Sequence, residues 1–598
     1  MSKDEFKQQF AAHVAEAFQQ CYADKFQELG QQQVFDPDFI YDLLEKPKDP
    51  RMGRFALPVF RFARIVGDKP PTIASRIAEI FRKTDSVTIT ATGGFLNAQV
   101  DSATLATKTI GQVLEAQKNY GASSEGDGKN LLVEYSSVNI AKPFGIAHLR
   151  TTILGASLRT IFKKLGYNAV GINYLGDWGT QFGKLIVAFR KWSKEYSGKD
   201  ITRIAMLFLL YVRFHKMAKE DKSLVEDARN VFRALEGGGD AKTTELWQQF
   251  RSQSIEEFKR IYDRLGVEFD LITGEANLND KMQPIIERLE KAELTRISEG
   301  ALVVDVDDTQ LPPCLLKKAD GATLYATRDI AGAFWRYEKF GYDQSLYVVA
   351  NSQSDHFKQV FGVIKRLEEA EQTPDNQRLT PRLKHVDFGW VKFGDRAMST
   401  RGGNVIPVED VIDKAASLVT DMIREKNPDL ENIDDTAAMV GVGAVKFSQL
   451  SVKRQTDVNF NWEAVLSFEG ETGPYLQYTH ARLCSLERKF GQPVTADVNV
   501  VMLDGEEERR VVELLADFPE AIADAARNYD PYFIAAHSLR LAGAFNKFYQ
   551  RKAPDGRVDK IISDNTSLTA ARMALVVSVR LVIGEGLRLL GIQAPEEM

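Results

Sequence analysis

Four side chains with different chemistry lie close together in the stretch before Arg150. Glu134 carries a carboxylate, Asn139 an amide, Lys142 an ammonium and His148 an imidazole. This mixture suits a site that binds a nucleotide together with a charged small molecule. The spacing therefore marks residues 134–150 as a candidate ligand-binding segment.

The elements around this segment read as a strand, a tight polar loop and a helix. Residues 131–135 are a short apolar run of strand type, and apolar residues recur at helical spacing from Leu149 to Leu165, before Gly166. A second apolar run at 169–175 completes a βαβ unit with a right-handed crossover and a parallel sheet. In such sheets ligands bind above the strand ends, where a helix amino terminus offers N–H groups to phosphate.

A second candidate set follows later in the chain. Tyr325 and Asp329 stand four residues apart near the start of an amphipathic helix, and Gln353 follows a buried-type strand at 345–350. A guanidinium requires carboxylates and other fixed acceptors, which these residues could supply. The alternatives are a plain aspartate favoured by the helix dipole and an ordinary loop amide.

Composition describes an ordinary globular chain. Its 598 residues are 44% hydrophobic and 27% charged, enough for several domains. Cys21, Cys314 and Cys484 lie far apart without CxxC spacing, so we expect neither disulfides nor a thiolate zinc site, which suits a reducing cytoplasm. We expect no targeting segment and no membrane span, because no run of about 18 apolar residues occurs. The net charge of −6 neither requires nor excludes an RNA partner.

The segment 134–150 resembles the signature-bearing segment of arginyl-tRNA synthetases, class I enzymes whose first motif is usually written HIGH. Gly145, Ile146, Ala147 and His148 hold the four motif positions, so the second histidine is present while the first is glycine. Lys142 stands where these enzymes commonly carry a lysine. One strand later, GDWGTQFG at 176–183 is a distinctive mark of the same family. Its glycines allow close backbone approach, while Asp177, Trp178 and Gln181 offer one charge, one stacking face and one amide.

The resemblance implies roles for the two candidate sets. In the family, the glutamate and asparagine that match Glu134 and Asn139 hold the backbone end of arginine. The matching tyrosine, aspartate and glutamine, here Tyr325, Asp329 and Gln353, hold its guanidinium end.

A later segment occupies the place of the second class I signature, KMSKS. RAMSTRGGNVIP at 396–407 lacks both signature lysines, but its glycine-rich loop could bring Arg401 to triphosphate oxygens. The resemblance implies that Lys142, His148 and Arg401 carry the catalysis. It implies an ATP-binding set made of Gly145, Ala147, His148, Met398, Ser399 and Arg401.

The expected fold is a Rossmann-type α/β catalytic domain between two further domains. Residues 1–115 read as an α/β module whose strand pattern at 86–100 breaks at Gly93 and Gly94, and the resemblance makes it a tRNA-elbow-binding domain. Residues 116–465 form the catalytic domain, with a helical insertion at about 191–294, a second half resuming near Ala301, a strand at 385–393 and a helical stem. Residues 466–598 form an all-α anticodon-binding bundle of the DALR type.

Helix-spaced apolar residues between 514 and 589 predict this bundle. HSLRLAGAFNKFY at 537–549 resembles the DALR helix itself. Exposed aromatics and cations would suit unstacked anticodon bases and their phosphates, while the alternative for several of them is a place in the core. The candidates are Tyr475, Tyr478, Arg482, Arg540, Tyr549 and Arg551.

The function implied by the resemblance is that of an arginine–tRNA ligase. Arginine, ATP and arginine tRNA would be its partners, Mg²⁺ would accompany ATP through phosphate and water, and neither zinc nor a membrane is expected. A cytoplasmic monomer is the expected state. The alternative is a catalytically impaired paralogue that binds tRNA or arginine as a regulator, because Gly145 replaces a motif histidine and loss of one such donor typically costs about 100-fold in rate.

Overall fold

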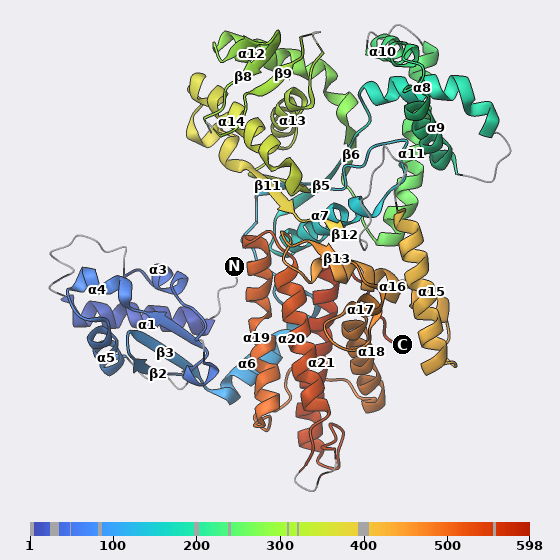
Figure 1. Cartoon of the computed structure of the whole chain (residues 1–598). Coiled ribbons are helices and arrows are strands. Elements are labelled where there is room, and N and C mark those ends of the chain that lie inside the picture. The colour runs from blue at the N-terminus through green and yellow to red at the C-terminus, as the bar shows by residue number, and fades with distance from the viewer. Residues whose placement is uncertain are drawn as a thin grey trace. The chain divides into compact units, whose positions relative to one another are not determined.

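The computed structural model (Figure 1) describes residues 5–23, 25, 35–47, 49–81, 86–196, 202–236, 241–307, 310–319, 322–392, 406–553, 556 and 558–598. The chain divides into two compact units. The first contains residues 1–122, 485–520 and 540–582, and the second contains residues 123–484, 521–539 and 583–598.

A five-stranded parallel sheet forms the centre of the second unit, with the strand order β11-β10-β4-β5-β6. The chain passes from β4 outward to β5 and β6, and then returns to the other side of β4 for β10 and β11. This reversal beside β4 is the point at which open α/β sheets bind ligands. The strands are β4 (Asn130–Glu134), β5 (Asn168–Leu175), β6 (Leu271–Gly274), β10 (Gln344–Ala350) and β11 (Leu383–Phe388).

Helix α7 (Ile146–Lys164) makes the predicted crossover between β4 and β5. It packs closely on the sheet because Gly155 has no side chain: a Cβ there would lie 2.1 Å from the Cβ of Tyr135. Gly166 follows the helix with φ of 88°, a conformation that favours glycine. The predicted βαβ unit and parallel sheet are therefore confirmed.

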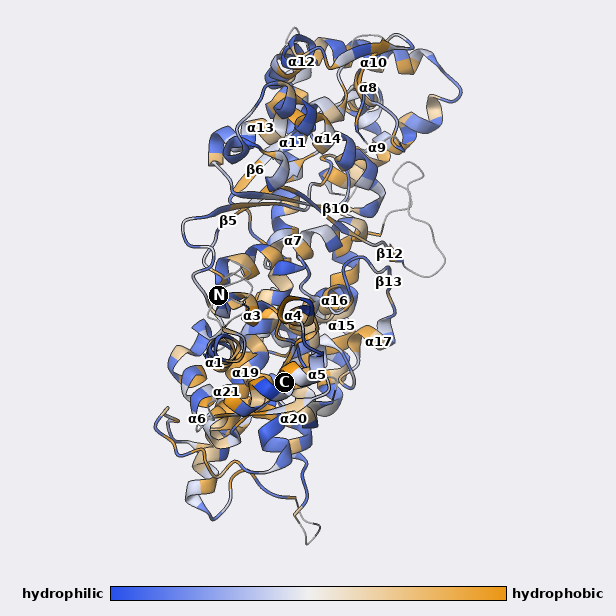
Figure 2. Ribbon diagram, turned by 90° about the vertical axis from the view of Figure 1, so that its left-hand side faces the viewer, coloured by the Kyte–Doolittle hydropathy of each residue, from blue (hydrophilic) through white to orange (hydrophobic). Residues whose placement is uncertain are grey.

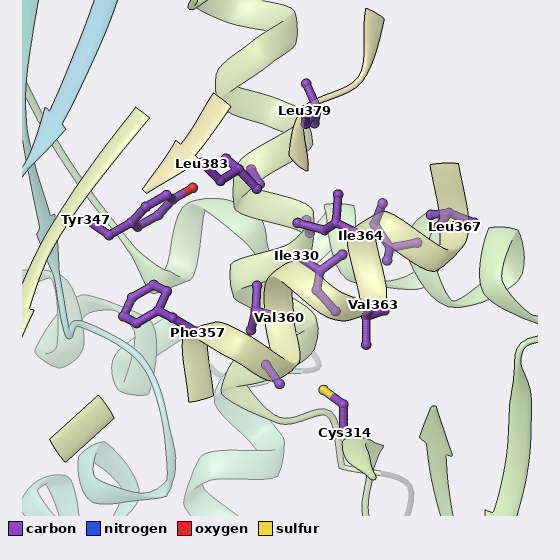
Figure 3. Close-up of a cluster of buried hydrophobic side chains, with 14 of the residues drawn as sticks. Cys314, Ile330, Tyr347, Phe357, Val360, Val363, Ile364, Leu367, Leu379 and Leu383 are labelled. Atoms are coloured by element: carbon purple, nitrogen blue, oxygen red, sulfur yellow. The ribbon is translucent and has the colours of Figure 1, made fainter. Parts of the chain in front are cut away.

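A second hydrophobic layer lies beside strand β10 and combines α13 (Tyr325–Phe340) with α14 (Ser354–Ala370). Figure 3 shows Ile330 of α13 among Val360, Val363 and Ile364 of α14, all of which are buried. This packing fixes helix α13, which carries two of the predicted guanidinium-binding residues, Tyr325 and Asp329.

The insertion after β5 is helical, but it is shorter than expected. Helices α8 (Thr180–Trp192), α9 (Arg203–Met217), α10 (Ser223–Glu236) and α11 (Ala241–Leu265) precede strand β6. The expected insertion of about 191–294 was therefore wrong at its end, because β6 pairs in parallel with β5 inside that range. A four-residue edge strand is too short to leave a clear periodic signal.

The hydrophilic and hydrophobic sides of α10 and of α12 (Met282–Lys291) are visible in Figure 2.

Two other expected boundaries also differ. Strands β7 (Thr295–Ser298), β8 (Ala301–Val304) and β9 (Cys314–Lys317) form a separate antiparallel sheet, so the parallel sheet resumes at β10 and not near Ala301. The strand expected at 385–393 is two strands, because β11 ends at Phe388 and β12 (Val391–Lys392) pairs with β13 (Val458–Asn459). Residue 393 lies outside the described residues.

The first unit begins with an α/β module. Strands β1 (Phe55–Pro58), β2 (Val87–Thr92) and β3 (Phe95–Val100) form an antiparallel sheet in the order β1-β3-β2, so the predicted hairpin at 86–100 is confirmed. Gly93 adopts φ of 58° at its turn. Its helices are α1 (Glu5–Cys21), α3 (Pro37–Asp42), α4 (Phe60–Val66), α5 (Pro70–Ile80) and α6 (Ser102–Ala116).

The remainder of the chain is almost entirely helical, as the periodicity predicts. Helix α21 (Thr566–Leu589) is the described helix that is long and apolar enough to cross a membrane, and 67% of its apolar window is buried inside the protein, as in the core of a helical bundle. The helices are α15 (Val408–Lys426), α16 (Ile433–Leu450), α17 (Trp462–Leu466), α18 (Gly473–Phe490), α19 (Glu506–Arg527), α20 (Tyr532–Tyr549) and α21 (Thr566–Leu589).

Candidate functional site

Glu134 ends strand β4 and forms a buried ion pair with Arg336 of helix α13. Both side chains are less than a tenth exposed. The Arg336 guanidinium lies 5.2 Å from the ring centroid of Tyr174 on β5 and 5.2 Å from that of Tyr347 on β10. The end of β4 is therefore a polar centre walled by two aromatic rings from its neighbouring strands.

Burial raises the pKa of Glu134, Arg336 opposes the rise, and the nearby Asp329 carboxylate adds to it. Burial alone would lower the pKa of Arg336, but the Glu134 carboxylate acts together with Tyr347, Tyr174 and Asp329 to hold that pKa above its usual value. The two charges thus depend on each other. Nothing in the sequence around Arg336 singled it out, because its partner lies about two hundred residues earlier.

Replacing Arg336 with methionine is expected to lower the free energy of unfolding by about 3–5 kcal/mol, because the Glu134 carboxylate would stay buried without its counter-charge. Denaturant-induced unfolding measures this loss. Arg288→Met is the matched control: it removes a partly exposed pair with Glu371 (2.7 Å), which should be worth about 1 kcal/mol or less. Equal losses in the two variants would contradict a special role for the buried pair.

The structure brings together two of the three predicted guanidinium-binding residues. Asp329 lies within 2.6 Å of the Nε2 atom of His356 on helix α14, and the Tyr325 ring lies 4.8 Å from the His356 ring. Tyr325 remains 56% exposed. Gln353 is also exposed and ends the short turn that follows β10, so it lies on the same edge of the sheet.

Asp329 contacts His356 and also acts electrostatically on the polar centre at the end of β4. Its charge raises the pKa of Glu134, of Tyr174 and of Glu275, so all three lie within its electrostatic reach. Glu275 directly follows β6, and burial raises its pKa to about 7, with Arg328 opposing the rise. Sequence reasoning missed Glu275, because the strand that places it was not recognised.

The first-signature residues lie at the start of helix α7. Lys142 donates a hydrogen bond to Oε1 of Gln181 (3.1 Å), and its ammonium lies 5.2 Å from the Tyr211 ring centroid. Burial and the Lys142 charge lower the pKa of His148 to about 4. The imidazole is therefore neutral near pH 7. Its Nδ1 atom is buried and has no hydrogen-bond partner among the described residues.

The GDWG segment has a structural use that the sequence did not reveal. Asp177 was expected to offer its charge to a ligand, but it is buried and accepts hydrogen bonds from Nε of Arg251 (2.8 Å) and from N–H of Ala276 (2.9 Å). Its role is to join the insertion to the sheet. The glycine before it behaves as predicted, since a Cβ on Gly176 would lie 2.3 Å from Oδ1 of Asn139.

Of the second-signature residues, Met398, Ser399 and Arg401 lie outside the described residues. The chain that follows them pairs with the first signature, because the Ile146 N–H donates to the Ile406 carbonyl (2.9 Å). On the other side, the buried Arg150 of helix α7 donates to the carbonyl of Gly389 (2.8 Å), and burial lowers its pKa to about 10. The described flanks of this segment therefore both contact the first-signature helix.

The predicted tRNA-contacting residues differ in exposure. Tyr478 is 39% exposed, and the Arg482 guanidinium lies 4.7 Å from its ring centroid. Tyr475 is half-buried in the same helix. These residues belong to the second unit.

In the first unit Arg540 is exposed, whereas Tyr549 is half-buried and packs against Phe545 with ring centroids 6.0 Å apart. Arg551 was expected to be an exposed cation, but it is largely buried and pairs with Asp559 (2.5 Å). It links two segments of the bundle. In both units, the described residues contain no group of three or more His, Cys, Asp or Glu side chains placed to hold a metal ion.

Three family models match consecutive parts of the chain. Residues 4–100 match the arginyl tRNA synthetase N terminal domain, residues 109–462 match the catalytic domain of class I tRNA synthetases (R), and residues 476–598 match the DALR anticodon binding domain. The three matches follow the order of the α/β module, the parallel sheet and the helical bundle.

Full-length relatives agree with these matches. The arginine–tRNA ligase of Clostridioides difficile is 41% identical over 583 residues, which is 97% of this chain and 99% of that protein. The arginine–tRNA ligase of Enterococcus faecalis is 43% identical over 94% of this chain and 96% of its own length.

Solved structures share the fold. The arginyl-tRNA synthetase of Thermus thermophilus superposes with a TM-score of 0.83 at 24% identity, and that of Plasmodium falciparum with a TM-score of 0.79 at 20% identity. Both comparisons cover 100% of each chain. With its switch-point site, its two flanking domains and its full-length relatives, the chain belongs to the arginyl-tRNA synthetase family.

Proposed function

We propose that this protein is an arginine–tRNA ligase, which activates L-arginine with ATP and transfers it to the 3′-terminal adenosine of arginine tRNA. The observation that carries the proposal is the carboxylate-rich, aromatic-walled centre at the strand ends, where the Asp329 carboxylate acts electrostatically on both Glu134 and Glu275. Lys142 and His148, whose side chains can bind phosphate, stand in the loop and helix that follow Glu134. The arginine–tRNA ligases of similar length support the same reading.

Arginine would lie across this centre. Asp329, held by His356, faces the planar and permanently charged guanidinium, and Tyr325 and Gln353 add a ring and an amide at the same edge. Glu134, at the end of β4, and Asn139, in the loop that follows it, hold the α-amine of arginine. Arg336 opposes the rise in the Glu134 pKa and so favours the ionised carboxylate that this role needs.

ATP would lie over the start of helix α7. The neutral His148 can donate one ring N–H to a phosphate oxygen, and Lys142 supplies a full positive charge. When bound with the nucleotide, Mg²⁺ would neutralise further charge on the phosphates. The remaining ATP-binding residues of the proposal are Gly145, Ala147, Met398, Ser399 and Arg401.

Neither chemical step requires a protein nucleophile. The arginine carboxylate attacks the α-phosphate of ATP and expels pyrophosphate, and the ribose hydroxyl of the tRNA then takes the arginyl group from the adenylate. The protein positions the reactants and stabilises negative charge on the phosphates. Lys142 and His148 serve this purpose from the first signature and Arg401 from the second.

Arginine binding should depend on pH through Glu275. This carboxyl, with its pKa raised to about 7, is mostly neutral at pH 6 and mostly ionised at pH 8. Because the ionised form attracts the guanidinium, the KM for arginine should fall roughly tenfold between these two pH values. Glu275→Gln should flatten this profile and keep KM high. An unchanged pH dependence in Glu275→Gln would remove Glu275 from the arginine site.

The partners follow from the same proposal. Residues 1–115 contact the tRNA elbow, and residues 466–598 bind the anticodon arm, with Tyr478, Arg482 and Arg540 offering a ring and two cations at the surface. Tyr475 and Tyr549, which are half-buried, can contribute only their outer edges. The protein acts in the cytoplasm as a monomer, without a membrane partner.

A catalytically impaired paralogue was the alternative suggested by Gly145, and no comparison favours it. Aminoacylation of arginine tRNA with labelled arginine separates the two functions, because a regulator would bind tRNA without charging it. L-Citrulline, which replaces the guanidinium by a neutral urea group, is the matched control substrate. Charging with arginine and not with citrulline is the expected result, and tRNA binding without charging would overturn the proposal.

A further inference from the structure

The loop between β4 and α7 contains three residues with backbone conformations that side chains disfavour. Ser136, Ser137 and Ala141 have φ of 73°, 50° and 60°, in the left-handed region that usually requires glycine. Such conformations persist when the surrounding structure holds them, and they are typical of functional sites. These residues lie between Glu134 and Lys142, so whatever holds them also sets the positions of the proposed arginine and ATP ligands.

Helix α11 of the insertion holds Ala141. The Ala141 N–H donates to the hydroxyl oxygen of Ser254 (2.9 Å), and that hydroxyl donates to the carbonyl of Phe250 (2.6 Å). Ser254 is fully buried, and the Ala141 methyl packs in the apolar core of the insertion with Leu185. The N–H of the residue immediately before Lys142 is therefore held by a serine from a helix more than a hundred residues away.

The same helix also contacts the two serines, about two turns further on. The Tyr262 hydroxyl lies 2.8 Å from the Ser136 hydroxyl and accepts a hydrogen bond from Nδ2 of Asn173 (3.0 Å). Asn173 in turn accepts the N–H of Ser137 at its Oδ1 atom (3.2 Å). Tyr262 thus reaches one left-handed serine directly and the other through Asn173.

Helix α11 is itself held at both ends of the stretch that contacts the loop between β4 and α7. Nε of Arg251 binds Asp177 of the GDWG segment (2.8 Å). The buried Lys446 ammonium donates to the carbonyl of Leu265, the last residue of the helix (2.8 Å). Between these points the Phe258 ring packs against Phe144, with centroids 6.2 Å apart. The helix is thus fixed along the whole stretch that faces the loop.

We propose that helix α11 is a positioning element for the active-site loop. Ser254 sets the position of Lys142, and Tyr262 sets the backbone between Glu134 and Asn139. Both act through the loop and touch no reacting atom, so they are positioning residues. The inference rests on the proposed function and deepens it, because it assigns the insertion a part in arginine activation.

Ser254→Ala tests the first half. Arginine-dependent ATP/pyrophosphate exchange, measured with tRNA present, should show a kcat reduced roughly tenfold with little change in the KM for arginine. Ser578→Ala is the matched control, because Ser578 is also fully buried in a helix and donates to the carbonyl four residues earlier (2.7 Å), within its own helix α21. Thermal unfolding of both variants shows whether they lose similar stability.

Tyr262→Phe tests the second half. It keeps the ring packing against Phe144 and removes only the hydroxyl, so the KM for arginine should rise roughly tenfold, more than kcat falls. Tyr342→Phe is the control, since the buried Tyr342 hydroxyl donates to the Ala333 carbonyl (3.1 Å) within a hydrophobic core.

The outcomes are distinguishable. A kcat defect in Ser254→Ala and a KM defect in Tyr262→Phe, with normal activity in both controls, would support the positioning role. Test variants that behave as their controls, in an active wild-type protein, would overturn the inference alone. A wild-type protein without exchange activity would overturn the proposed function and the inference with it.

Discussion

Asp329→Asn is expected to raise the KM for arginine about 100-fold while leaving the KM for ATP nearly unchanged. The substitution keeps the shape of the side chain and removes the charge that faces the guanidinium. Asp329 is three-quarters buried and bound to His356 (2.6 Å), so its carboxylate is preorganised and poorly replaced by water. Steady-state exchange kinetics at varied arginine and varied ATP measure the two effects separately.

Asp355→Asn is the matched control for this charge. Asp355 precedes His356 in helix α14, but it is exposed and paired with Lys358 at the surface (3.4 Å). Asp355→Asn should leave the KM for arginine and the KM for ATP within about twofold of their wild-type values, because exposed ion pairs contribute little. An arginine KM that is unchanged in Asp329→Asn would remove the guanidinium role from Asp329.

Lys142→Met should lower kcat for arginine activation about 100-fold, with little effect on arginine binding. Methionine keeps an apolar stem that can lie over the Tyr211 ring and removes only the ammonium. We expect kcat to fall and arginine binding to persist, because the ammonium acts on the phosphates as pyrophosphate departs, whereas arginine is held by other residues. Single-turnover formation of the adenylate measures the chemical step directly.

Lys365→Met provides the control, because Lys365 is an exposed lysine of helix α14 that pairs with Asp307 (2.9 Å). It should retain full activity. If Lys142→Met also kept its rate of adenylate formation, charge stabilisation would have to come from other groups. The second-signature residue Arg401 would then be the next to substitute.

Much of the fold was predictable from local signals. The βαβ unit from β4 to β5, the hairpin from β2 to β3 and the long helices of the bundle all have clear periodicity and turn residues. Strand β6 and the sheet β7-β8-β9 were missed, because strands of four residues leave almost no periodic pattern and depend on partners elsewhere in the chain. Whether such a segment forms a strand depends on its pairing with strands elsewhere in the chain, and a single sequence does not show that pairing.

The candidate site, like the fold, was predictable where local motifs mark a residue and not where tertiary contacts decide its role. Tyr325, Asp329 and His148 could be found from motifs and spacing, since each stands at a predictable helix start. Arg336 and Glu275 could not, because their importance comes from burial beside Glu134 and Asp329. Asp177 was found but given the wrong role, because a motif marks a residue without saying whether its charge faces a ligand or another side chain. Exposure and partners supply that distinction.

Arginine-dependent ATP/pyrophosphate exchange, with and without an arginine tRNA bearing its native 3′ end, tests the central claim most directly. The assay follows the return of labelled pyrophosphate into ATP and requires the arginine, ATP and catalytic residues to act together. We predict exchange that depends on arginine and is absent with citrulline, at least when the tRNA is present. A protein that binds the tRNA but shows no exchange under either condition would contradict the account and identify Gly145 and Ala147 as marks of lost chemistry.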